Sequence, residues 1–147
     1  MTLDFIGLFL LLTGFVVGLG AVTVIDIHGI LGRKSSYWTE ATTRTHKVTK
    51  PMIWVGMVLC IVGGAMFYRN VGFTGIPLAH AVIAIVLMLN GYYLSFQVSP
   101  FLLKREKEGK SQELLPNSFQ KKIILSLIIS DVGWWGALFL LVYYVIH

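Results

Sequence analysis

Charged residues are scarce in this chain. They make up 13% of its 147 residues, whereas hydrophobic residues make up 56% and the mean hydropathy is +0.76. A soluble domain carries about 25% charged residues, so this composition excludes a water-exposed globular protein. Intrinsic disorder is excluded as well, because disordered chains have low hydrophobicity. The composition therefore predicts a polytopic membrane protein.

Cysteine is almost absent. Cys60 is the only one, so the chain can form neither an internal disulfide nor a Cys-x-x-Cys redox or metal pair. The sequence also has no nucleophile–base constellation, phosphate-binding loop or zinc-ligand spacing. We therefore predict no catalytic residues and favour a protein that is not an enzyme.

Four apolar segments are long enough to cross a bilayer, which takes about 20 residues as a helix. These four segments predict an all-α fold with a single transmembrane domain over residues 1–147. Because the connections between the segments are short, we expect a four-helix bundle built from two tandem hairpins. The expected spans are residues 5–27, 51–68, 77–103 and 123–146.

Basic residues predict the direction of the chain. The net charge is +5, yet the Lys and Arg residues lie between apolar runs, which favours a lipid bilayer rather than nucleic acid as the partner. Eleven of the twelve fall in two connections, residues 33–50 and 104–122, and only Arg69 lies elsewhere. By the positive-inside rule these connections are cytoplasmic loops and both termini face outward. We expect the protein to be located in the cell inner (plasma) membrane and to cross it several times.

The chain contains signs of an internal repeat. A shift of 71 residues aligns Gly20 with Gly91 and Asp26 with Gln97, which predicts two parallel hairpins with the latter pair at equivalent depths facing the bundle. Gly14 and Gly18 form a small-residue face that lets helices approach closely. This face is expected to pack inside the bundle; the alternative is a homo-oligomer interface.

Several polar residues lie inside the apolar segments. Asp131 is expected near the middle of the membrane, buried and protonated, with its hydroxyl donating a hydrogen bond to Asn90 or to a backbone carbonyl. Side chains three, four or seven apart share a helix face, so further polar residues are expected to converge with it on the bundle axis. The polar-core candidates are Asp131, Asn90, Tyr93, Gln97, Asp26 and Thr23.

Two interpretations of this polar core are open. The residues can act as packing contacts between helices, or they can bind or pass a proton, a cation or a metal ion. Histidines add a third interpretation, in which His80, or the pair His28 and His46, binds a metal or haem, since imidazole suits both.

The segments HGILGRKS, THKVTKPMIWVGM and HAVIAIVLMLNGYYLSFQVSP together resemble small bacterial membrane proteins of the CopD-like and HemJ-like type. That resemblance implies a four-helix integral membrane protein associated with copper handling or, in the HemJ-like branch, with protoporphyrinogen oxidation. The resemblance implies a role for one residue of this chain, His80, as a metal or haem ligand.

Three functions follow from these patterns. The leading hypothesis is a small membrane protein whose polar core binds or passes a metal ion, a cation or a proton. The second is a haem-dependent membrane oxidoreductase, and the third is a structural or assembly subunit.

Cysteine labelling tests the orientation. In a Cys60→Ala background, single cysteines at Ser36 and Ser111 are expected to resist an impermeant thiol reagent in intact cells and to react after lysis. Labelling of either position from outside would reverse the predicted orientation.

Overall fold

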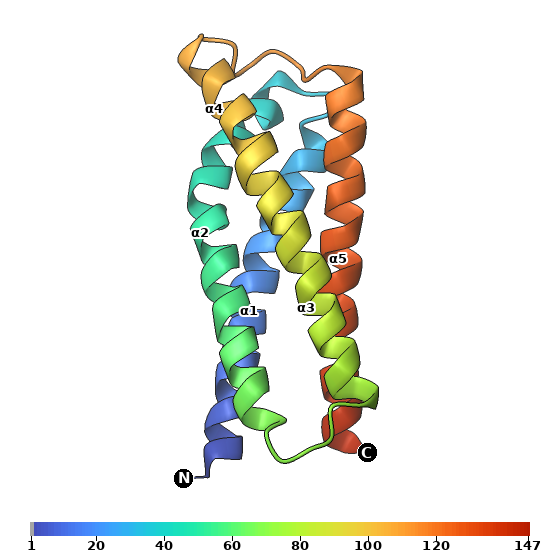
Figure 1. The fold of residues 1–147 in the computed structure, drawn as a ribbon. Helices are drawn as coiled ribbons and strands as arrows, with labels where there is room; N and C mark the ends of the chain where they lie inside the picture. The colour runs from blue at the N-terminus through green and yellow to red at the C-terminus, as the bar shows by residue number, and fades with distance from the viewer. Residues whose placement is uncertain (1) are drawn as a thin grey trace.

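The computed structural model describes residues 2–147 and consists of four helical rods that run side by side (Figure 1). Within this part of the chain there is no strand, which confirms the predicted all-helical, four-helix architecture. Each rod is long and apolar enough to cross a membrane. The rods are α1 (Leu3–Leu31), α2 (Ser36–Phe67), the continuous series α3 (Gly75–Tyr93), π-helix η1 (Leu94–Val98) and α4 (Ser99–Lys107), and α5 (Asn117–Ile146).

The two ends of the bundle differ. Both termini lie at one end, together with the connection of residues 68–74, and we call this the terminal end (Figure 1). The connections of residues 32–35 and 108–116 lie at the opposite end, which we call the basic end because most Lys and Arg residues are near it.

Large apolar side chains cover the outside of the bundle. Val16 is 76% exposed and Phe139 is 69% exposed, and similar residues occur on every rod. Monomeric soluble proteins rarely expose contiguous apolar surface on this scale, whereas a bilayer solvates it favourably. The exposed surface therefore agrees with a multi-pass membrane protein. Further examples are Phe9, Val58, Leu89, Phe96 and Val132.

Glycines bring α1 and α2 together more closely than any other two helices. A Cβ atom on Gly56 would lie 2.4 Å from the Cα of Gly18, and one on Gly63 would lie 2.4 Å from the backbone nitrogen of Leu11. A Cβ on Gly14 would meet the Cys60 side chain at 2.6 Å. The Gly14/Gly18 face thus contacts α2 and α5 within the chain.

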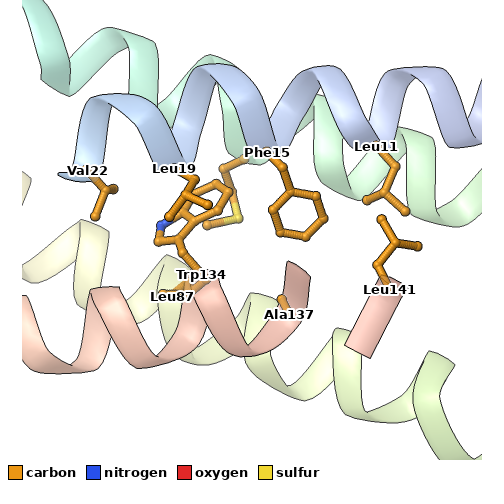
Figure 2. Close-up of a cluster of buried hydrophobic side chains, with 9 residues drawn as sticks. Leu11, Phe15, Leu19, Val22, Leu87, Trp134, Ala137 and Leu141 are labelled. Carbon is orange, nitrogen blue, oxygen red and sulfur yellow. The ribbon is translucent and has the colours of Figure 1, made fainter. Parts of the chain in front are cut away.

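The apolar core lies between α1 and α5. Phe15 of α1 meets the indole of Trp134 edge-to-face at 6.0 Å between ring centroids, and Trp134 is only 2% exposed. Side chains of both helices point toward each other along this seam (Figure 2). The cluster comprises Leu11, Phe15, Leu19, Val22, Met57, Leu87, Trp134, Ala137 and Leu141.

The helices extend into both segments that were predicted as cytoplasmic loops. Residues 36–50 are helical, so Pro51 lies inside α2 rather than at its start, and the second connection shortens to residues 108–116. Hydropathy detects only the apolar part of a helix and misses polar turns beyond it. In these polar turns of α2 the threonine hydroxyls bond within the helix: Thr42 donates to the carbonyl of Trp38 at 2.7 Å and Thr49 to that of Thr45 at 3.1 Å.

Gly56→Ala tests the close approach of α1 and α2. Its methyl group would overlap the Gly18 backbone, so we expect the free energy of unfolding in mixed micelles to fall by about 2 kcal/mol or more. Gly20→Ala is the matched control, because a Cβ there meets no atom within 4 Å. A stability loss that is equal in both variants would contradict the packing.

Candidate functional site

A cavity of about 110 Å³ lies inside the half of the bundle toward the basic end. We call it the inner cavity. Asp26 of α1, His46 and Lys50 of α2, Ser95 of η1 and Ser130 of α5 all contribute to its lining, among mostly apolar side chains. Its volume has room for several water molecules. The structure thus gathers two predicted candidates, Asp26 and His46, at one site.

Asp26 and His46 both present unpaired polar atoms. Asp26 is 4% exposed, and its Oδ2 is buried without a hydrogen-bond partner in the described part of the chain. The Nε2 atom of His46 is buried and unpaired as well. An unsatisfied buried polar group is costly and rare in native proteins, and two residues that carry such a group line the same cavity.

Lys50 and Trp54 of α2 also line the inner cavity. The Lys50 Nζ donates to the Ser95 carbonyl at 3.3 Å, and the Trp54 Nε1 donates to the Ser95 Oγ at 3.1 Å. Sequence reasoning missed both residues, because Lys50 was counted with the loop charges. Lys50 lies one helical turn after His46, and this spacing could have indicated that the two side chains share a helix face.

The π-helix η1 explains why Ser95 faces the cavity. A π-turn inserts one extra residue into the helical register, so the side chains that follow it rotate relative to those of α3. Ser95, Val98 and Ser99 are consequently buried, whereas Gln97 is exposed. The prediction that Gln97 shares the inward face of Asn90 is therefore wrong, and so is its predicted equivalence with the buried Asp26.

Asn90 is held between α3 and α5 by hydrogen bonds. Its Nδ2 donates to the Ser126 carbonyl and to the Ser130 Oγ, each at 3.0 Å, and the Ser126 hydroxyl donates to its Oδ1. These bonds use both functional groups of the amide. Asn90 therefore joins two helices rather than lining the inner cavity.

The remaining polar-core candidates lie apart from this cluster. Asp131 is only partly buried, and the predicted hydrogen bond from Asp131 to Asn90 is wrong because serines already occupy the amide. Thr23 donates to the Leu19 carbonyl at 2.9 Å within its own helix, and Tyr93 is partly buried.

The histidines do not gather into one site. His28 Nδ1 is 3.1 Å from the Thr45 hydroxyl. His80 Nε2 is 2.8 Å from the Ala137 carbonyl and its Nδ1 is 2.9 Å from the Tyr68 hydroxyl, so both of its ring nitrogens are engaged. Among residues 2–147, no three His, Cys, Asp or Glu side chains come together as a metal site.

An apolar wall closes the inner cavity on its deep side. Met57, Leu87 and Trp134 line it and also line a second cavity toward the terminal end. All three side chains are nearly fully buried. They carry no charged group, so the wall separates the two cavities with an apolar barrier.

No protein-family model, curated protein or solved structure matches this chain. The interpretation of the inner cavity therefore depends on its own geometry and chemistry.

A double-mutant cycle tests the Asn90 contacts. Asn90→Ala and Ser130→Ala should show a coupling of about 0.6 kcal/mol in unfolding free energy, typical of hydrogen bonds between membrane helices. The same cycle with Thr13→Ala, whose hydroxyl bonds within α1, should show no coupling. Equal coupling in both cycles would refute a direct Asn90–Ser130 interaction.

Proposed function

We propose that this protein is a small multi-pass membrane protein that binds a proton at Asp26 and His46 in the inner cavity. The proton reaches the cavity from the basic end. On the positive-inside rule we assign that end to the cytoplasm and the protein to the plasma (inner) membrane.

The proposal depends chiefly on one observation: Asp26, which has an unpaired carboxylate oxygen, and His46, which has an unpaired imidazole nitrogen, both line the same small cavity. An ionised carboxylate without partners in an apolar protein interior carries a large desolvation cost. A proton removes the charge of Asp26, and a water molecule in the cavity can carry that proton between Asp26 and His46. Ionisable residues at membrane depth typically form proton relays or ion sites.

The surrounding charges favour a proton over a metal ion. Lys50 lines the same cavity and places a positive charge near His46, which opposes a second cation there. Only one histidine lines the inner cavity, so it offers no pair of imidazoles.

The apolar wall gives the proton site a direction. Water would have to cross Met57, Leu87 and Trp134 to reach the terminal end, and hydrophobic constrictions of this kind block water and ions. In this conformation the site exchanges protons with the basic end alone.

The alternatives receive less support from the geometry. Both His80 nitrogens are engaged, and the inner cavity of about 110 Å³ is smaller than the roughly 300 Å³ at the lower end of small-molecule sites, which disfavours haem. A Soret band in the purified protein would reinstate the oxidoreductase hypothesis. The Asn90–Ser126 contact suits the assembly hypothesis, but that hypothesis does not account for the unpaired Asp26.

Infrared titration tests proton binding. In the vesicle-reconstituted protein, we expect a protonated-carboxyl band that shifts or disappears with pH and that Asp26→Asn removes. His46→Gln should change the pH at which this band responds.

Asp4→Asn is the matched control, since Asp4 pairs with Arg69 at 3.3 Å at the terminal end, away from the cavity. If Asp26→Asn leaves the pH-dependent band unchanged, or if Asp4→Asn removes it equally, the proposal is wrong.

A further inference from the structure

The second cavity lies in the half of the bundle toward the terminal end and has a volume of about 320 Å³. We call it the outer cavity. It extends between α2 and α3, with α1 and α5 behind it, and none of the proton-site residues lines it. Its volume reaches the range of sites that hold organic molecules.

Small side chains create this space. Gly64 and Ala65 of α2 face Ala81 and Ala84 of α3 across the cavity, and Ala137 of α5 lies behind them. Over this length α2 and α3 make few contacts, in contrast to the tight pairing of α1 with α2. The outer cavity therefore results from short side chains on helices that diverge (Figure 1).

The outer cavity has an open side. Four of its lining residues, Ile61, Ala65, Val71 and Phe73, are exposed at the surface of the bundle, and Ile61 is 41% exposed and Phe73 68%. Ile61 and Ala65 belong to a helix long and apolar enough to cross a membrane. The opening between α2 and α3 thus faces lipid rather than water.

The polar groups of the outer cavity satisfy one another. A carbonyl can only accept, so the His80 Nε2 donates to Ala137 and the Tyr68 hydroxyl donates to the His80 Nδ1. Burial raises the pKa of Tyr68 to about 12, so this hydroxyl keeps its proton. The Cys60 thiol is directed at the Leu11 carbonyl at 3.6 Å.

These pairings leave few groups to hold water. A buried water molecule needs two to four polar partners, whereas an apolar cavity binds apolar ligands. A cavity that is open to the bilayer and lined this way takes up the hydrocarbon that surrounds it.

We propose that the outer cavity binds one acyl chain of a membrane phospholipid. The chain enters between α2 and α3 and lies against Trp134 and Leu87. The lipid headgroup stays outside, at the level of Tyr68. A phospholipid is the expected source because it is the bulk component at the opening, and because the concave, enclosed shape suits a single flexible chain better than a helix of a second copy.

Photocrosslinking tests the proposal. The full chain is reconstituted in phosphatidylcholine vesicles with a trace of the same lipid carrying a diazirine within one acyl chain. After illumination, peptides that contain residues 60–68 and 77–87 should carry several-fold more adduct than the equally lipid-exposed α5 peptide around Val132 and Phe139.

Two glycine variants provide a matched comparison. A Cβ on Gly64 or on Gly136 meets no atom within 4 Å, so both positions tolerate a side chain, but only Gly64 lines the outer cavity. Gly64→Leu should reduce the adducts at α2 and α3 at least five-fold, and Gly136→Leu should leave them unchanged. The helical circular dichroism of both variants confirms that they fold.

Other outcomes would overturn the proposal. Adducts spread evenly over all exposed helices, or adducts that Gly64→Leu does not reduce, would show no chain in the cavity. Competition by an isoprenoid alcohol but not by unlabelled phospholipid would identify another source. Disulfide-linked dimers through Cys60 on mild oxidation would place a second copy there instead.

Discussion

The close approach of α1 to α2 is the constraint on which the rest of the bundle depends. Glycines on both helices remove the side chains that would keep the backbones apart, and the helices meet with backbone atoms in contact. In lipid, where burial of apolar surface gives helices no driving force to associate, such contact is a main source of attraction. The other two rods pack more loosely against this pair, and the space that they leave forms both cavities.

The two cavities divide the bundle into halves of different chemistry. The residues that line the inner cavity include a lysine and two residues with unpaired polar atoms. The polar side chains of the outer cavity bond to one another or to backbone carbonyls, and this cavity opens toward lipid. On the two proposals above, one set of helices holds a proton near the basic end and a hydrocarbon chain near the terminal end, with the Met57, Leu87 and Trp134 wall between them.

Composition and hydropathy predicted the four-helix architecture, because the length of each apolar segment can be read from the sequence. Asp26 and His46 could be chosen as candidates because they are polar residues in or near apolar segments. Gln97 could not be placed, because the register shift at η1 has no marker in a single sequence. The partnership of Asn90 with serines rather than Asp131 depends on the rotation of α5 about its axis, which hydropathy does not define.

Gly18 illustrates how tightly these features are linked. It lies where α1 contacts both α2 and α5. A Cβ at this position would lie 2.4 Å from the Trp134 ring of α5, while the Gly18 backbone faces Gly56 of α2. The hydrogen atom in place of a side chain at Gly18 seats the indole that divides the interior, and the one at Gly56 permits the helix contact against the Gly18 backbone. A shift of α2 against α1 at this level would therefore also move the residue on which the indole rests.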